Sequence, residues 1–339
     1  SFDPCRRVQP FQRPASSDFT KDPPIVKIPL PLCRPYIQVT KTMNLEQHDR
    51  YDFVPLTSRQ DYTWPDGKRL AVCFCNNIEV FSFLSGLGSD STLPNPPQST
   101  RNYAWRDYGN RVGQWYLFDL FDEMEVPASH NLNSLLFEAC PEIVERIQRR
   151  GDEVIGHGRT NAERQDVLEA PDEASLIAES TAAITAAFGA PPAGWLGPYL
   201  AQTEVTLDLL KEAGYQYVMD WPADDQPFWM RTRAGSILSV PYSIELNDSP
   251  AMVFRQHGTR TFEEMMVDQF DEMLHQSAKW PLVYTAVLHP FVIGQPFRLR
   301  ALRRAMAHIL SHRDEIWLTT PGQIAAYCAG MPAGIIPGS

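Results

Sequence analysis

Three strand-like segments of the chain each end in a side chain that can take up or release a proton. The apolar run 70–80 carries Glu79 near its end, a short strand leads to His157 between two glycines, and the run 281–289 ends at His289. Carboxylates and imidazoles are the groups that general acid–base catalysis uses most. The repeated placement at strand ends predicts that Glu79, His157 and His289 meet in one catalytic site.

Polar and aromatic side chains accompany this trio. Asn77 shares a strand face with Glu79, because side chains two residues apart point to the same side. We expect Asn77, Asn161 and Trp195 to orient substrate carbonyls or to shape the pocket, and for Trp195 a role in packing alone stays equally open. Arg106 could bind an anionic group of the substrate or serve in a structural ion pair.

The elements that position these residues follow from the hydrophobic pattern. From residue 70 onward, short apolar runs alternate with amphipathic segments, which predicts an α/β fold with a mainly parallel sheet. Polar residues gather after the carboxyl ends of six or seven predicted strands, as they do in barrel-like sheets. The main predicted elements are helices over 111–122, 141–150 and 299–311, a helix beginning at 171, and strands over 153–155, 215–219, 237–240, 281–289 and 315–318.

The N-terminal region differs in composition. Residues 1–60 hold nine of the 29 prolines, which disfavours helix interiors and central strands. We therefore predict an extended, proline-rich N-terminal arm over 1–60 and a catalytic domain over 61–339. The arm could strap the domain or a neighbouring subunit, or it could be a disordered leader.

Composition and charge narrow the partners. The formal net charge of −11 repels phosphate backbones and anionic lipid, so we expect no nucleic acid and no membrane surface as a partner. No apolar run approaches the ~20 residues that span a bilayer. The six cysteines lack zinc-ribbon spacing and are predicted to be reduced in a cytoplasmic protein.

Five short segments carry a family resemblance: Asn77-Ile78-Glu79, Gly156-His157-Gly158, Leu288-His289-Pro290, Gly194-Trp195-Leu196-Gly197-Pro198 and Asp224-Asp225-Gln226-Pro227. With them, the chain resembles the polysaccharide deacetylase superfamily, with its NodB homology region, over residues 60–330. The last two segments resemble those of metal-independent allantoinases and cyclic imide hydrolases. The resemblance implies a deformed (β/α) barrel, a small-molecule substrate and assembly into a homodimer or homotetramer.

The resemblance also bears on metal binding. Metal-dependent members carry a pair of aspartates, one as base and one as ligand, and a His-x-x-x-His pair on the metal. Here the corresponding positions hold Asn77, Glu79, His157 and Asn161. A neutral amide is a poor zinc ligand, so Glu79, His157 and Asn161 would hold zinc or another divalent ion weakly. We expect no cofactor.

Without a metal, an activated water must attack a carbonyl whose oxyanion is stabilised by fixed donors. A cyclic imide, a hydantoin or allantoin meets that demand better than the N-acetyl group of a sugar polymer. We predict a hydrolase of such non-peptide carbon–nitrogen bonds, with Glu79 or His157 as base and, as the resemblance implies, His289 as acid. The alternatives are a metal-dependent deacetylase with unusual ligands, a non-catalytic binding protein and a lyase.

Overall fold

The computed structural model of the chain describes residues 47–88 and 98–339. Most of the predicted arm over 1–60 lies outside the described residues. Its last part, from residue 48, belongs to the compact unit that runs to Ser339. There the Arg50 guanidinium pairs with Asp208 at 2.9 Å, and Arg59 donates to Asp224 at 2.7 Å.

The centre of this unit is a nine-stranded sheet in the order β6-β7-β5-β4-β3-β2-β1-β8, with β9 paired to β1. All pairs are parallel except β6 with β7. The strands are β1 (Leu70–Ile78), β2 (Ser129–Leu132), β3 (Glu153–Gly156), β4 (Gly194–Trp195), β5 (Tyr217–Val218), β6 (Phe228–Thr232), β7 (Gly235–Ser239), β8 (Leu282–Leu288) and β9 (Ile316–Leu318).

Strand β1 is the axis of the sheet, and all nine of its residues are buried. One edge pairs with β8 along residues 70–76. The other edge pairs with β9 at its start and with β2 at its end, where Asn77 lies opposite Asn131. Because β1, β2, β3 and β8 are parallel, their carboxyl ends meet on one side of the sheet.

The sheet curves into a deformed half-barrel. Within the part of the chain that the structure describes, no ladder joins β7 to β8, and a single parallel bridge between Asn247 and Val287 lies on the open edge of β8. The predicted α/β barrel is therefore confirmed as a curved, mostly parallel sheet that stays open on this side.

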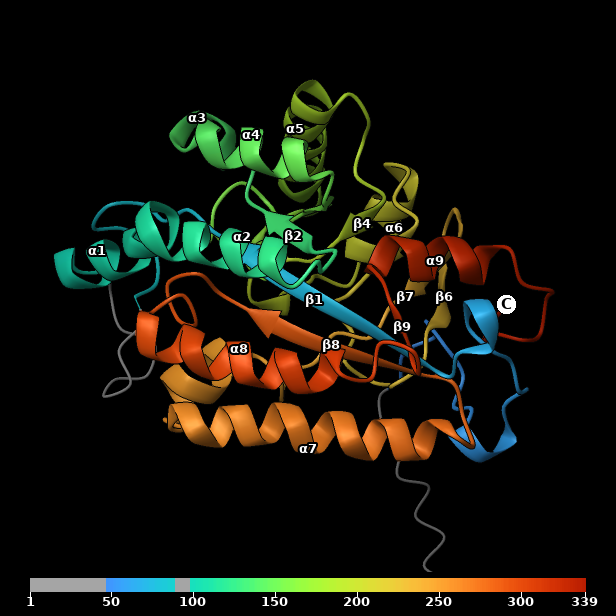
Figure 1. The fold of residues 1–339 in the computed structure, drawn as a ribbon. Coiled ribbons are helices and arrows are strands. Elements are labelled where there is room, and N and C mark those ends of the chain that lie inside the picture. Colours follow the sequence, from blue (N-terminus) through green and yellow to red (C-terminus); the bar gives the residue numbers. More distant parts are fainter. Residues whose placement is uncertain (1–46, 89–97) are drawn as a thin grey trace, which may run out of the picture. The chain divides into compact units, whose positions relative to one another are not determined.

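Helices cover the sheet (Figure 1). Figure 1 shows α7 and α8 side by side, and their apolar faces pack onto β8 through Phe270, Met306 and Tyr284, among others. The helices of at least seven residues are α1 (Thr100–Tyr108), α2 (Gln114–Glu123), α4 (Pro141–Arg150), α5 (Ala170–Phe188), α6 (Thr206–Glu212), α7 (Thr259–Ser277), α8 (Pro296–Leu310) and α9 (Pro321–Ala329). Among the described residues, no helix combines the length and the hydrophobicity that crossing a bilayer requires.

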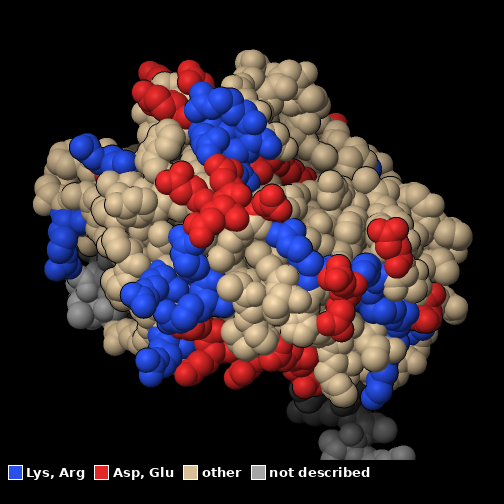
Figure 2. Space-filling model, in the orientation of Figure 1, with Lys and Arg blue, Asp and Glu red and all other residues tan. Residues whose placement is uncertain are grey.

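The surface carries both signs of charge. On the face drawn in Figure 2, basic and acidic side chains stand next to one another. Ion pairs of Arg303 with Glu123 and of Arg304 with Glu263 link α8 to α2 and to α7. Exposed pairs of this kind contribute little to stability one by one.

Candidate active site

The structure brings Glu79, His157 and His289 together at the carboxyl end of the sheet. Oε1 of Glu79 lies 3.5 Å from Nε2 of His157 and 3.6 Å from Nε2 of His289. The three residues are 8%, 2% and 7% exposed. Each follows directly after a strand, namely β1, β3 or β8. The parallel order of the sheet thus brings together residues that lie more than 70 positions apart in the chain.

The turn after β3 fixes the ring of His157. Gly158 has φ +65°, a backbone conformation that favours glycine. Nδ1 of His157 donates to the carbonyl oxygen of Leu196 at 2.6 Å, since a carbonyl can only accept. In the neutral ring the lone pair is then on Nε2, which faces Glu79 and has no hydrogen-bond donor among the described residues. His157 therefore presents a proton acceptor to the centre of the site.

His289 is held by a buried carboxylate. Asp248 accepts from Nδ1 of His289 at 2.7 Å and from the backbone N–H of the same residue at 2.8 Å. Because both oxygens of Asp248 accept, we place the shared proton on the imidazole. Burial alone would lower the pKa of His289, but Asp248 and Glu79 raise it well above its ordinary range. His289 is thus a cation at neutral pH.

The two carboxylates differ in their surroundings. Burial acts to raise the pKa of Glu79, but the positive charge of His289 and the nearby His157 ring hold it well below its ordinary range. Burial raises the pKa of Asp248 although the His289 cation opposes this. Glu79 is therefore ionised in the folded protein and is a weak base.

Hydrogen-bonded amides fix the orientation of Asn161, which is the third neighbour of Glu79. The backbone N–H of Val80 donates to Oδ1 of Asn133 at 2.9 Å. A backbone N–H cannot accept, so Nδ2 of Asn133 must face the other way, where it donates to Oδ1 of Asn161 at 2.9 Å. Nδ2 of Asn161 in turn donates to Oε1 of Glu79 at 2.5 Å. Asn161 thus turns a donor, and not its oxygen, toward the catalytic centre.

This donor set does not fit a tight divalent metal site. Glu79, His157 and Asn161 could act as three ligands only if Asn161 turned its oxygen inward. That rotation would break the bond to Glu79 and set the amide hydrogens of Asn161 against those of Asn133. An uncompensated loss of buried hydrogen bonds costs about 1–3 kcal/mol per group.

Asn77 lies in the cavity wall but is fully engaged. Its Nδ2 donates to the carbonyl oxygen of Leu288 at 3.1 Å, and its Oδ1 accepts from Nδ2 of Asn131 at 2.9 Å. The hydroxyl group of Tyr242 lies 3.1 Å from Nδ2. Asn77 therefore ties the ends of β1, β2 and β8 together beside the catalytic groups.

The remaining two predicted residues, Arg106 and Trp195, have different surroundings. Arg106 lines the cavity, stacks over the ring of Phe81 at 3.8 Å and donates from Nη1 to the carbonyl oxygen of Leu87 at 2.7 Å. Trp195 is fully buried in a core cluster and does not line the cavity. Its Nε1 donates to Oε1 of Gln165 at 3.3 Å. Trp195 therefore packs the interior behind the site.

The cavity around these groups has a volume of about 220 Å³. Tyr199, with φ +64°, lies in a turn after β4 and donates from its hydroxyl group to the backbone oxygen of Asn161 at 2.6 Å. Apolar side chains complete the wall: Phe81, Leu196, Leu200, Pro250, Phe254 and Phe291. The lining of the cavity thus combines polar and charged groups with apolar side chains.

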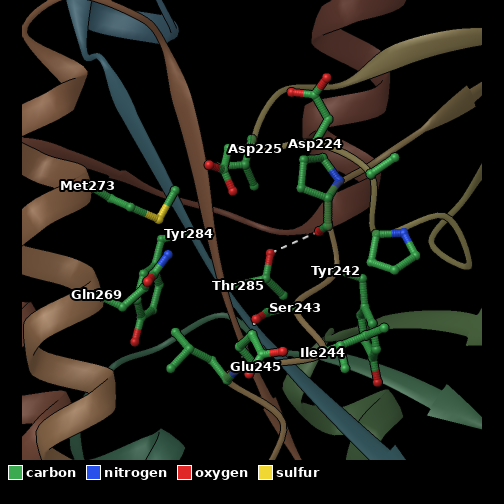
Figure 3. Close-up of a pocket in the computed structure, with 15 residues that line it drawn as sticks. Asp224, Asp225, Tyr242, Ser243, Ile244, Glu245, Gln269, Met273, Tyr284 and Thr285 are labelled. Atoms are coloured by element: carbon green, nitrogen blue, oxygen red, sulfur yellow. Dashed lines mark hydrogen bonds between the residues drawn. The ribbon is translucent and has the colours of Figure 1, made fainter. Parts of the chain in front are cut away.

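A second, larger hollow of about 420 Å³ lies on the open edge of β8. Figure 3 shows Asp224, Asp225 and Thr285 around it, with the Thr285 hydroxyl group donating to the backbone oxygen of Pro241 at 2.9 Å. This hollow shares Tyr242 with the catalytic cavity and has no imidazole in its lining. Glu79, His157 and His289 thus belong to the smaller cavity.

Sequence reasoning missed several residues of the site. Asp248 belongs to an Asn-Asp pair in the loop that follows the predicted strand over 237–240, too far beyond the strand end for its position to mark it. Asn133 follows the polar strand β2, which no hydrophobic pattern reveals. Tyr199 sits in a turn whose strained backbone has no clear sequence signature.

A parallel half-barrel with a buried acid–base cluster at the carboxyl ends of its strands suits hydrolysis of a carbon–nitrogen bond other than a peptide bond. Comparisons with known proteins agree, because this chain is similar to the polysaccharide deacetylase superfamily. A family model described as polysaccharide deacetylase matches residues 103–218. A protein of Schizosaccharomyces pombe whose name assigns it to the polysaccharide deacetylases is 27% identical over 294 residues, covering 77% of this chain and 91% of that protein.

Further similar proteins include both deacetylases and an allantoinase. The peptidoglycan deacetylase of Helicobacter pylori is 23% identical over 275 residues, covering 71% of this chain and 91% of its own. The crystal structure of PuuE allantoinase matches with a TM-score of 0.71 at 25% identity, covering 79% of this chain and 93% of the other. A probable polysaccharide deacetylase from Pseudomonas aeruginosa PAO1 matches with a TM-score of 0.69 at 25% identity, covering 78% and 92%.

Proposed function

We propose that this hydrolase opens a small cyclic amide or imide, such as allantoin, a hydantoin or a cyclic imide, with little or no metal. One observation carries the proposal: Asn161 donates to Glu79 at the corner where metal-dependent relatives need a ligand. Similarity to PuuE allantoinase supports a ring as substrate. Since deacetylases are similarly close, the amide of an N-acetyl sugar is the competing substrate.

In the proposed reaction His157 is the general base. Its Nε2 faces the cavity with a lone pair, and imidazole is the side chain whose basicity suits neutral pH. Glu79 is less suited because its pKa is held low. Its negative charge, 3.5 Å from Nε2, instead stabilises the imidazolium ion that forms when His157 takes a proton from water.

His289 is the proposed general acid. The water oxygen attacks the carbonyl carbon, and the carbon–nitrogen bond breaks as Nε2 of His289 gives its proton to the leaving nitrogen. Asp248 keeps His289 charged and directs Nε2 toward the cavity. Solvent then returns the proton from His157 to His289. The products are a carboxylic acid, which releases its remaining proton to solvent and becomes a carboxylate, and the nitrogen group that stays attached through the opened ring.

The size and charge of the cavity favour a small substrate. Its volume of about 220 Å³ falls below the ~300–1,000 Å³ of pockets that enclose drug-sized ligands. Arg106 and the amide of Asn161 add hydrogen-bond donors to this lining. An imide adds a second carbonyl that stabilises the leaving nitrogen, so less stabilisation by a metal is needed.

The test measures turnover of cyclic imides, hydantoins, allantoin and N-acetyl sugars by protein stripped of metal and by protein supplied with zinc. We expect ring opening by stripped protein at an undiminished rate. Activity that appears only with zinc and only on N-acetyl sugars would replace this proposal by a metal-dependent deacetylase. His275→Ala, at an exposed histidine, is the control for His157→Ala. If no substrate turns over, or if His157→Ala turns over substrate as fast as this control, the proposed role of the site is wrong.

A further inference from the structure

A second group of metal-ligating side chains lies on the helical pair α7 and α8, and none of its members lines the cavity around Glu79, His157 and His289. Asp271 on α7, His308 on α8 and His312 just after α8 each offer a ligand atom, and these atoms all lie within 4.8 Å of one another. We propose that they form a binding site for zinc or a similar transition-metal ion that links α7 to α8. The proposal is independent of the hydrolase function.

Spacing and packing bring the three residues together. His308 lies in the last turn of α8 and His312 in the turn that follows it, and the centroids of the two rings are 5.5 Å apart. The helices α7 and α8 run side by side (Figure 1), and Nε2 of His308 already reaches Oδ1 of Asp271 at 2.7 Å. Ligands at about 2.0–2.2 Å from zinc lie within about 4 Å of one another, so small rotations of these partly exposed side chains suffice.

Neighbouring groups hold both imidazoles in place. The buried ring of Phe270 contacts them at centroid distances of 6.0 Å for His308 and 5.5 Å for His312. Oε1 of Glu315 accepts from Nδ1 of His312 at 2.7 Å, which leaves the lone pair of the neutral ring on Nε2. A carboxylate on the second nitrogen is the usual outer partner of a metal-binding histidine.

The ligand set selects the class of metal. Two neutral imidazoles and one carboxylate suit Zn²⁺, Ni²⁺ or Cu²⁺, with water in the remaining position. Mg²⁺ and Ca²⁺ prefer a shell of oxygen ligands, which this group does not supply. A simple surface ion pair between His308 and Asp271 is the competing interpretation, and its partners are 36% and 52% exposed.

The test is a zinc titration of metal-stripped protein against a chromophoric chelator. We expect one equivalent to bind, and we expect His308→Ala and His312→Ala each to weaken binding about tenfold or more. Two variants should bind zinc unchanged: His48→Ala, at an exposed histidine elsewhere, and His157→Ala, at the catalytic site. Excess Mg²⁺ should not compete.

A second readout is thermal. Zinc should raise the midpoint of unfolding of the starting protein but not of the His308→Ala/His312→Ala double variant. His308 and His312 are both partly exposed, so circular dichroism is expected to show a folded double variant. Zinc binding that survives in the double variant, or that disappears in His157→Ala, would overturn the proposal.

Discussion

One hydrogen bond sets which nitrogen of His157 can accept a proton. Because Leu196 accepts from Nδ1, only Nε2 is left to activate water. Replacing His157 by Gln keeps a polar side chain of similar size but removes the base. We expect kcat of metal-stripped protein to fall by about 10²- to 10⁴-fold, with substrate affinity changed far less. Steady-state kinetics and equilibrium binding measure the two effects, and a loss confined to affinity would contradict the assignment.

The charge of His289 depends on Asp248. Activity that needs the imidazolium is present below the pKa of His289 and is lost as pH rises through it. Asp248→Asn removes the main group that raises this pKa, so we expect the alkaline limb of the kcat/KM profile to move to lower pH. A profile that keeps its alkaline limb while activity drops uniformly would point to a structural role for Asp248.

The residue types at the candidate active site were predictable, but the orientations of their side chains were not. The sequence predicted Glu79, His157 and His289 as a trio and marked Asn161 as an amide at a ligand position. Whether Asn161 shows its oxygen or its nitrogen to Glu79 depends on Asn133 and on the backbone N–H of Val80. That relay joins residues from three separate segments, and no local pattern contains it.

The turn that carries His289 rests directly on a helix. Gly113, between the π-helical turn Gly109–Gly113 and α2, approaches the backbone of Pro290 and Gly294 so closely that an added Cβ would overlap the Pro290 carbonyl group. Gly113→Ala must push this turn away. We expect a loss of about 1–3 kcal/mol in the free energy of unfolding and a lower kcat, since His289 moves with the turn.

The matched control for that variant is Gly258→Ala. Gly258 precedes α7 with φ −66°, and an added Cβ there meets only one side-chain atom, at 4.0 Å. Its stability and kcat should stay close to those of the starting protein. Denaturant titration and steady-state kinetics compare the two variants, and equal effects would show that the contact with Pro290 does not position His289.

At the level of helices and strands, hydrophobic patterns succeeded where one helix face is buried, as in α4, and where a whole strand is buried, as in β8. The predictions over 141–150 and 281–289 correspond to α4 and β8. Strand β2 was missed because its sequence, Ser-His-Asn-Leu, is mostly polar although every residue is buried. Its polar groups pair inside the protein, as His130 does with Asp152. Strand β6, the antiparallel partner of β7, was also missed. A hydrophobic pattern can indicate a strand, but it does not show which strand pairs with it.

Considered as a whole, the folded chain keeps one buried carboxyl group that should tie its stability to pH. Asp220 accepts from the backbone N–H of Gly197 at 2.6 Å through Oδ1, whereas Oδ2 has no partner among the described residues. Burial raises the pKa of Asp220 to about 8. The unfolded chain ionises near pH ~4, so this group destabilises the fold progressively as pH rises from about 4 to about 8.

Asp220→Asn keeps the acceptor for Gly197 and removes the titration. We expect the variant to gain stability over the starting protein as pH rises through this window, by a few kcal/mol at most. Denaturant titrations at pH 5 and pH 8 measure the change. A difference between the two proteins that is the same at both values would mean that Asp220 is already ionised in the fold at pH 5.

The pair of histidines four residues apart at the end of α8 also has a practical consequence. Immobilised nickel retains pairs of neighbouring imidazoles, and these two are partly exposed, so the protein without any affinity tag should bind such a column and elute with imidazole. Protein purified in that way would carry nickel between α7 and α8. A metal analysis of such a sample would then report on this surface pair, and the catalytic centre should be judged on protein prepared without metal affinity.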